Sequence, residues 1–394
     1  MSYSKEDFLN YLAPTSPFPF AIPIERAEGI YLYSPDGKRY TDFISGIGVS
    51  NLGHRHPKVV AAIEQQLQKH LHVMVYGEFI QSAPNQLAAK LAKLLPPTLN
   101  CTYLVNSGTE ANEGALKLAK RVTGRTEIVS FRKSYHGSTH GSLSVSGNET
   151  KKQAFRPLLP DVRFIEFNRI EDLSQISHRT AAVIIETIQG DAGVRIPGLN
   201  FMQALRKRCD ETGAQLIFDE IQCGMGRTGT LFAFERFGVI PDILTVGKAF
   251  GGGLPIGAFV SHRDKMKLLT HDPMLGHITT FGGNPLCCAA ALATLQAIEE
   301  ENILEGVEQK GAYLESRLQH RLVREIRRAG LMLAIDFDSA DRVQRIVEAA
   351  LAEGVICFWF LSHPYSFRLA PPLTVSLQQI DESCNVILKA IENS

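Results

Sequence analysis

The sequence has 394 residues, of which 44% are hydrophobic and 21% charged, and Lys plus Arg equals Asp plus Glu at 41 each. This length exceeds one ordinary hydrophobic core, so we expect at least two domains. The balanced charge predicts neither a nucleic-acid partner nor a membrane partner, and the longest apolar stretch, 286–298, is too short to span a bilayer. Seven cysteines without a Cys-x-x-Cys spacing indicate reduced thiols, so we expect a cytoplasmic protein.

Residues 1–50 predict an opening helix, a proline-rich turn and a β-hairpin whose strands flank the turn sequence Asp36-Gly37. No linker composition follows, so we expect this segment to pack against later parts of the chain. Two amphipathic helices come next, one beginning at Pro57 and one covering about 84–95. His54 and His56 have no acidic or cysteine neighbour in the sequence, so we interpret them as loop residues and predict no metal site.

From residue 101 onward, short apolar runs alternate with amphipathic helices. The candidate strands are 102–105, 127–131, 162–167, 182–185, 216–218, 243–246 and 258–261. This alternation predicts an α/β fold with a mostly parallel, seven-stranded sheet covered on both faces. After Pro285 the pattern changes to long helices and short strands, which predict a smaller α+β domain. We therefore expect residues 1–50 to pack with the small domain, 51–285 to form the large domain and 286–394 the small one.

Two of the predicted strands end at an ionisable residue. The run 216–218 leads into Asp219, and the run 243–246 leads through a glycine into Lys248. Ligands of open α/β sheets bind outside the carboxyl ends of the strands, so we hypothesise an acid and a lysine that face one ligand. Burial would lower the pKa of the lysine and favour the neutral amine that a Schiff base requires. The alternatives are a salt bridge from Asp219 to a core arginine and a lysine side chain that reaches the surface.

A second group of candidates surrounds the end of the strand 102–105 and the end of the next strand. Ser107, Gly108 and Thr109 lie where a strand passes into a helix, and their backbone N–H groups could bind a phosphate. An ordinary helix cap is the alternative reading. Tyr135 follows the strand 127–131 and could stack on a flat ring or simply cover the sheet edge.

Two further candidates lie near and beyond the predicted domain boundary. Thr280 belongs to a stretch of hydroxyl residues and glycines that suits a phosphate or an ordinary loop. Arg368 is the one charged residue of an apolar strand that proline terminates. A buried arginine requires a carboxylate, which could belong to the protein or to a substrate.

Taken together and in this order, the segments resemble the class III (ω-amino acid) aminotransferases, which are fold-type I enzymes dependent on pyridoxal phosphate (PLP). The resemblance covers nearly the whole chain. Its most specific pieces are NSGTEANEGALKLAK, DEIQCGMGRTG, GKAFGGGLPIGA and TTFGGNP, which begin at residues 106, 219, 247 and 279. It implies that 51–285 is the PLP-binding domain.

The resemblance also implies a role for each site residue. Lys248 would bind PLP as a Schiff base, and Asp219 would pair with the pyridinium nitrogen. The other implied PLP contacts are Ser107, Gly108 and Thr109 at the phosphate, Tyr135 and Ile221 on the two ring faces, and Gln222 near the phenolic oxygen. Thr280 would reach the phosphate of the neighbouring subunit, which implies a homodimer with shared sites. Arg368 would bind the α-carboxylate of the substrate.

The chain departs from the family pattern at positions that concern the substrate. Ser138 stands where many enzymes acting on acetylornithine, ornithine or 4-aminobutyrate have an arginine for a second carboxylate. The family's Glu-Pro-x-Gln-Gly-Glu begins here at Glu186 and ends at Asp191, which is one methylene shorter as a partner for Arg368. Ile47 stands where ornithine enzymes place an aromatic residue. These departures argue against acetylornithine, ornithine and 4-aminobutyrate as substrates, and against the usual binding of the distal carboxylate of 2-oxoglutarate.

We therefore predict an aminotransferase that moves an amino group from an amino acid or an ω-amine to a 2-oxo acid, with 2-oxoglutarate as the expected acceptor, in ping-pong half-reactions. An aminomutase, an epimerase or a decarboxylase of the same fold is the alternative. A nucleotide-binding dehydrogenase lacks support, because no Gly-x-Gly-x-x-Gly follows a first strand with an acid beyond it. A non-catalytic binding module is disfavoured because both Asp219 and Lys248 are present.

Overall fold

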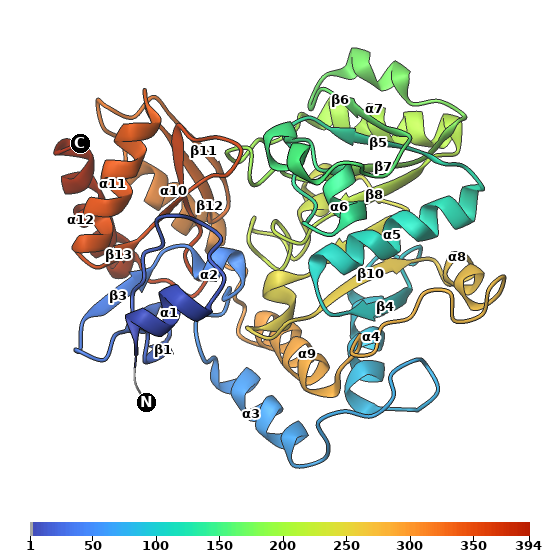
Figure 1. Cartoon of the computed structure of the whole chain (residues 1–394), viewed down its shortest axis with the longest axis horizontal. Helices are drawn as coiled ribbons and strands as arrows, with labels where there is room; N and C mark the ends of the chain where they lie inside the picture. The colour runs from blue at the N-terminus through green and yellow to red at the C-terminus, as the bar shows by residue number, and fades with distance from the viewer. Residues whose placement is uncertain (1–2) are drawn as a thin grey trace.

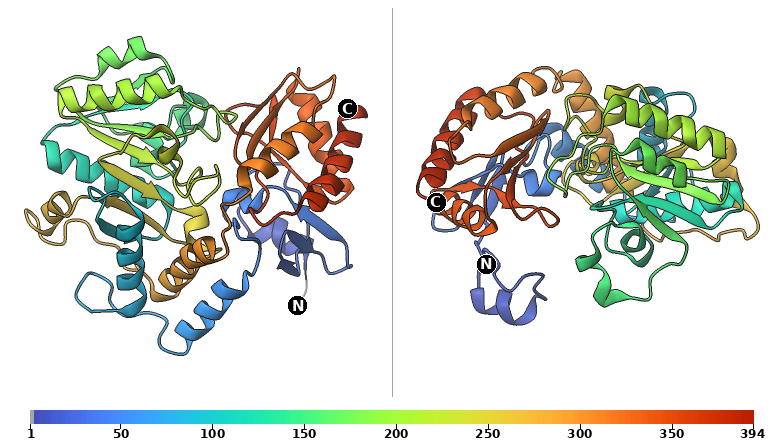
Figure 2. Two further views of the ribbon diagram at one scale, coloured as in Figure 1. Left: turned by 180° about the vertical axis from the view of Figure 1, so that it is seen from behind. Right: turned by 90° about the horizontal axis from the view of Figure 1, so that it is seen from above.

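The computed structural model describes residues 3–394 and contains three β-sheets, one large and two small. The large sheet and its covering helices form one half of the molecule, and both small sheets lie in the other half (Figure 1). The first strands of the chain lie beside the C-terminal helices, as two further views show (Figure 2). Both ends of the chain therefore contribute to the smaller half.

The large sheet has the strand order β4-β10-β9-β8-β7-β5-β6. Only β10 is antiparallel to its neighbours β4 and β9, whereas β9, β8, β7, β5 and β6 run parallel. The bounds are β4 Cys101–Val105, β5 Glu127–Phe131, β6 Val162–Ile165, β7 Thr180–Glu186, β8 Gln215–Asp219, β9 Ile243–Val246 and β10 Gly257–Ser261. All the strands predicted for the sheet are present, and the predicted α/β fold with a mostly parallel, seven-stranded sheet is confirmed.

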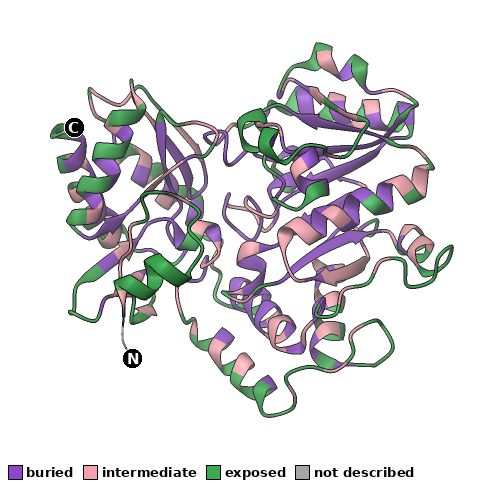
Figure 3. Cartoon of the chain, in the orientation of Figure 1, coloured by how far each residue is buried: buried purple, intermediate pink, exposed green. Residues whose placement is uncertain are grey.

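Alternate residues of the central strands pack on opposite faces of this sheet, as the pleat requires. Ile184 and Ile217 belong to the core that α5 (Gly108–Thr123) covers. Val183 and Leu216 belong to the larger core on the other face. Helices α4 (Ser82–Leu94), α7 (Leu199–Thr212) and α9 (Pro285–Glu300) cover that second face. The central strands are consequently buried along their whole length (Figure 3).

The smaller half contains two four-stranded sheets. One has the order β1-β2-β3-β13, in which β3 and β13 are parallel, and the other has the order β11-β12-β15-β14. The strands are β1 Arg26–Glu28, β2 Tyr31–Tyr33, β3 Arg39–Asp42, β11 Glu325–Ala329, β12 Met332–Asp336, β13 Val355–Ile356, β14 Phe358–Trp359 and β15 Ser366–Leu369. Helices α10 (Val307–Arg317), α11 (Ala340–Ala352) and α12 (Leu377–Glu392) pack with these strands in one core.

The remaining α-helices are α1 (Lys5–Tyr11), α2 (Ser45–Gly48), α3 (Pro57–Leu67), α6 (His140–Val145) and α8 (Arg263–Met266). Between residues 3 and 394, no helix is both long enough and apolar enough to cross a membrane.

The boundary between the two halves differs from the one expected at residue 285. Helix α9 packs against α3 and α4, and its residues Ala291 and Leu295 are buried in the core of the large sheet. The Ala-rich sequence of α9 predicts a helix but does not indicate which core it joins. We therefore propose that the large domain continues to the end of α9, and that the small domain combines the N-terminal strands with the residues after Glu300.

Candidate active site

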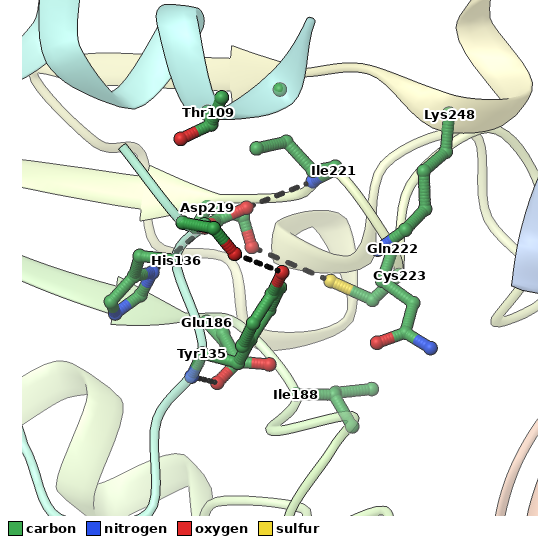
Figure 4. A pocket seen from close by; sticks show the side chains of 13 residues that line it. Thr109, Tyr135, His136, Glu186, Ile188, Asp219, Ile221, Gln222, Cys223 and Lys248 are labelled. Carbon is green, nitrogen blue, oxygen red and sulfur yellow. Dashed lines mark hydrogen bonds and ion pairs between the residues drawn. The ribbon is translucent and has the colours of Figure 1, made fainter. Parts of the chain in front are cut away.

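A cavity of about 260 Å³ lies at the carboxyl ends of β7, β8 and β9. Side chains of Asp219, Ile221, Tyr135 and Lys248 are gathered around it (Figure 4). The predicted site residues that line this cavity are Gly108, Thr109, Tyr135, Ser138, Glu186, Asp219, Ile221, Gln222 and Lys248. The predicted residues Ser107, Ile47, Thr280, Asp191 and Arg368 are not among its lining residues. The two strand-end charges thus share one cavity, as the sequence predicts.

Three donors hold the carboxylate of Asp219 at the end of β8. Its Oδ2 accepts hydrogen bonds from His136 Nδ1 at 2.7 Å and from Asn112 Nδ2 at 2.8 Å. Its Oδ1 accepts the backbone N–H of Ile221 at 3.1 Å. Asn112 is fixed in turn, because its Oδ1 accepts the Thr245 hydroxyl at 2.8 Å. This buried network keeps Asp219 oriented toward the cavity and leaves no core arginine beside it, so the salt-bridge alternative is wrong.

Lys248 is the residue after the glycine that follows β9. Its backbone adopts a left-handed conformation with φ 47°, which is costly for a residue with a Cβ atom and is common at functional sites. Burial lowers the pKa of the Lys248 amine, while the negative charges of Asp219 and Glu186 oppose that effect. The side chain lines the cavity and does not reach a loop surface, so the surface alternative for this lysine is wrong.

The N-terminus of α5 forms a narrow cradle beside the cavity. Ser107 is the N-cap, and its Oγ accepts the N–H of Glu110 at 3.3 Å. A Cβ atom at Gly108 would lie 2.8 Å from the side chain of Ile221, and one at Gly137 would overlap the Thr109 hydroxyl. Only glycine fits at these two positions. Because Ser107 accepts from Glu110, the N–H groups of Gly108 and Thr109 are the ones that can face an anion at this helix start.

Glu186 lies at the end of β7 on the same cavity wall. It accepts the backbone N–H groups of Tyr135 and Gly190, each at 2.9 Å. Burial raises the pKa of Glu186 from 4.5 to about 7, and the negative charge of Asp219 contributes. Tyr135 extends from this anchored backbone, and its Oη lies 3.3 Å from the Oγ of Ser138. Glu186 thereby fixes the position of the aromatic ring.

Arg368 lies in β15 and is paired with a carboxylate of the protein. Its Nη2 lies 3.0 Å from Asp191 Oδ1, and its Nε donates to the carbonyl oxygen of Trp359 at 3.2 Å. Both charged side chains are buried. Asp191 also accepts the N–H of Leu361 and the hydroxyl of Ser362, at 3.1 and 2.8 Å. The carboxylate that the sequence predicts beside Arg368 therefore belongs to the protein in this structure. One oxygen of Asp191 contacts one guanidinium nitrogen, so the ion pair is not bidentate.

A strained turn connects the small domain to the site. The residues Ser45, Gly46, Ile47 and Gly48 all have positive φ values, between 49° and 72°. Asp42 holds this turn, because its carboxylate accepts the N–H groups of Ile44 and Gly46, each at 3.0 Å. A Cβ atom at Gly48 would be in contact with the Gln222 side chain. Ile47 is therefore near the cavity without lining it.

Arg227 joins this turn to the loop that follows Gln222. Its guanidinium is completely buried and donates to Asn51 Oδ1 and to the carbonyl oxygens of Leu331 and Pro371. Burial lowers the pKa of Arg227 to about 9, with Asp42 as the opposing charge. This one side chain contacts the N-terminal segment, the turn between β11 and β12, and the segment after Arg368.

Thr280 lies apart from the cavity and is exposed. Its neighbour Phe281 is exposed too, at 56%, and Ile80 in the loop before α4 is exposed at 95%. Two interactions tie the segment to the loop before α4: the rings of His72 and Phe281 lie 5.0 Å apart, and Asn284 Nδ2 donates to the carbonyl oxygen of Leu71. Large apolar side chains exposed in this way are typical of an interface.

The residues of the cavity fit PLP. Asp219 supplies a buried negative charge for a protonated ring nitrogen, and Lys248 supplies an amine for the aldehyde. Tyr135 and Ile221 present flat and branched apolar surfaces, and the glycine cradle at the start of α5 leaves space for a phosphate. These are the donor and acceptor types that this cofactor requires.

Sequence reasoning missed two residues of the Asp219 network, Asn112 and His136. Both lie inside motifs that were already singled out. Asn112 occupies the buried face of α5 one turn before Leu116, and a polar residue at such a position is a recognisable indication of a specific hydrogen bond. His136 follows Tyr135 directly, and its Nδ1 faces Asp219.

Residues 12–391 match the family model described as Aminotransferase class-III. The chain is 39% identical over 383 residues to the LysW-aminoadipate semialdehyde/glutamate semialdehyde transaminase of Sulfolobus acidocaldarius, with 94% of this chain and 96% of that protein covered. It is 40% identical over 381 residues to the acetylornithine aminotransferase of Methanocaldococcus jannaschii, with 93% and 92% covered. The solved ornithine aminotransferase of Toxoplasma gondii superposes with a TM-score of 0.91 at 27% identity and covers 99% of this chain and 95% of its own.

Proposed function

We infer the roles of the individual residues from one premise: the chain belongs to the class III aminotransferase family and is a PLP-dependent aminotransferase. The observation that carries the inference is the meeting of Asp219 and Lys248 in one cavity, delivered by adjacent parallel strands. We propose Asp219 as the partner of the pyridinium nitrogen and Lys248 as the residue that binds PLP covalently.

PLP, when bound, supplies an electron-withdrawing ring that stabilises negative charge on the reacting carbon of the substrate. Lys248 then removes and returns the proton at that carbon, a task that burial favours because it lowers the pKa of the amine. His136 and Asn112 keep Asp219 in place through their hydrogen bonds. Tyr135 and Ile221 hold the ring between them, and the start of α5, from Ser107 to Thr109, binds the phosphate.

For the acceptor we propose a 2-oxo acid, with 2-oxoglutarate as the first candidate. Its α-carboxylate would replace Asp191 as the partner of Arg368, because the resting pair occupies the guanidinium. For the donor we propose an amine at the end of a carbon chain. One relative is named for acetylornithine and another for LysW-aminoadipate semialdehyde. In this chain Ser138 stands at the position where a cation could otherwise bind a second carboxylate.

We also propose a homodimer in which Thr280 reaches the phosphate site of the partner subunit. The exposed apolar side chains of Phe281 and Ile80 support an interface, and Thr280 is remote from the cavity of its own chain. Light scattering should give twice the chain mass, and a fully active monomer would contradict the shared site. The cytoplasm remains our proposed location.

The test of the function is a pair of half-reactions. Purified enzyme should be yellow, and borohydride should attach the cofactor to Lys248, which peptide mapping can locate. An amino donor should convert the enzyme to its pyridoxamine form, and a 2-oxo acid should convert it back. Release of carbon dioxide, or racemisation without any pyridoxamine form, would instead indicate the decarboxylase or epimerase alternative.

A further inference from the structure

A second cavity, of about 310 Å³, adjoins the one that contains Lys248. Tyr135 and Ser138 line both, so the pair of hydroxyls 3.3 Å apart forms the partition between them. On the far side, the wall is mainly apolar and includes Leu143 of α6, Phe155 and Leu361. The side cavity therefore continues the substrate space in the direction away from Lys248.

This side cavity spans the two domains, and most of its polar groups are paired with one another. Asn148 Nδ2 donates to Ser362 Oγ at 2.9 Å, Ser362 donates to Asp191 at 2.8 Å, and Asp191 pairs with Arg368. The single negative charge on the wall is consequently neutralised. Few hydrogen-bonding groups of these four side chains therefore remain available to a ligand.

Lys151 and the exposed His140 are exceptions, and of these Lys151 carries the fixed positive charge. This lysine lines the side cavity from an exposed position at the end of a short 3-10 helix, Glu149–Lys151. Its neighbour Lys152 points elsewhere and is held by the carbonyl oxygen of Ser146 and by Glu149. Across residues 3–394, no carboxylate forms an ion pair with Lys151, whereas Lys152 and Arg156 both pair with Glu149. A ligand in this cavity thus meets apolar walls and then the Lys151 ammonium, with the His140 imidazole on the same lining.

Resting on the aminotransferase function above, we propose that the side cavity holds the non-reacting end of the amino donor, an apolar carbon chain that ends in a carboxylate paired with Lys151. The space suffices, since a cavity of about 150 Å³ already accommodates benzene. Arg368 remains paired with Asp191 while such a donor is bound. The donor and the 2-oxo acid thereby use different cations for their carboxylates.

The first measurement is the dependence of the donor half-reaction on chain length. Formation of the pyridoxamine form should be followed with n-alkylamines from propylamine to hexylamine, and kcat/KM should rise about fourfold with each methylene until the cavity is filled. 6-Aminohexanoate should be preferred to 4-aminobutyrate. A flat response to chain length overturns the proposal, and L-glutamate and L-alanine serve as reference donors. If only L-glutamate and L-alanine react, the proposed role of the side cavity is refuted and the aminotransferase function stands. If no donor reacts, the aminotransferase function is refuted as well.

The second measurement isolates the cation. The ratio of kcat/KM for 6-aminohexanoate to that for hexylamine should fall about fivefold in Lys151→Met, which is the scale of an exposed ion pair. Lys151→Arg should preserve the ratio. Lys207→Met is the matched control, because Lys207 is an exposed lysine of α7 that pairs loosely with Glu211 at 3.9 Å. An unchanged ratio in Lys151→Met, or an equal fall in Lys207→Met, overturns the role of Lys151.

Discussion

Replacing Asp191 by asparagine tests whether the internal ion pair competes with the 2-oxo acid. Asparagine can still accept the N–H of Leu361, which donates to Asp191 at 3.1 Å, but it carries no charge for Arg368. The guanidinium, 3.0 Å from Asp191 in the resting protein, would then be buried without a charged partner, although its Nε still donates to the carbonyl oxygen of Trp359. An incoming carboxylate would no longer have to displace a competitor.

The magnitude follows from the contact that is lost. A hydrogen bond between charged groups contributes about 1.5–3 kcal/mol, so Asp191→Asn should tighten 2-oxo acid binding by about 10- to 100-fold. The same substitution leaves a buried charge unpaired, which costs about 3–5 kcal/mol of folding stability. The variant should therefore melt earlier without ligand, and the 2-oxo acid should stabilise it more than it stabilises the parent protein.

The assay is a single-turnover reaction of the pyridoxamine form with increasing 2-oxoglutarate, which gives Kd from the concentration dependence of the rate. Asp336→Asn is the matched control, because Asp336 pairs with Arg327 at 2.6 Å in the sheet that contains Arg368 and does not line the cavity. That control should lose stability without any change in Kd. If Asp191→Asn weakens binding as Arg368→Ala does, Asp191 only positions the arginine and the competition argument is refuted.

Three further outcomes are expected. Burial raises the pKa of Glu220 from 4.5 to about 8. Between these pH values the folded chain holds a proton that the unfolded chain releases, so the free energy of unfolding falls as the pH rises. The difference between the two pKa values corresponds to about 5 kcal/mol, and Glu220→Gln should flatten this pH dependence in urea unfolding at pH 5 and pH 8; an identical slope would contradict the assignment. Arg227→Lys keeps the charge but loses the planar fork, so it should cost about 2–3 kcal/mol of stability and raise KM while PLP affinity is retained, measured by thermal melts and steady-state kinetics; equal melting temperatures would rule this out. Asp219→Asn should lower kcat by about 100-fold or more, and turnover near that of the parent protein would remove Asp219 from the mechanism.

The large sheet could be predicted closely because its strands are short apolar runs interrupted by polar loops. The predicted bounds of β5 and β9 agree with the structure. Strand β11 was missed, since Glu325–Ala329 contains Arg327 and Arg328, whose charges pair with Asp336 of β12 and Glu315 of α10. A charged edge strand has no apolar alternation by which a sequence could reveal it.

The residues of the candidate site likewise fall into those that local sequence reveals and those that only tertiary packing brings together. Asp219 and Lys248 were found because each follows a buried run directly, and local sequence determines that placement. The pairing of Arg368 with Asp191 joins residues 177 positions apart, and only tertiary packing brings them together. The side cavity depends on contacts between segments of both domains, so no local pattern could have indicated it.

The parallel pairing of β3 with β13 has a consequence for how the chain is made. Thr41 donates its N–H to the carbonyl oxygen of Gly354 at 2.7 Å, so the first sheet of the small domain is completed only by residues synthesised after the whole large domain. Phe43 is fully buried in the folded protein, so its side chain stays exposed until the later residues that cover it have been synthesised. The large domain is complete earlier and can fold first. The nascent N-terminal segment is therefore the part of this enzyme that most needs protection from aggregation during synthesis.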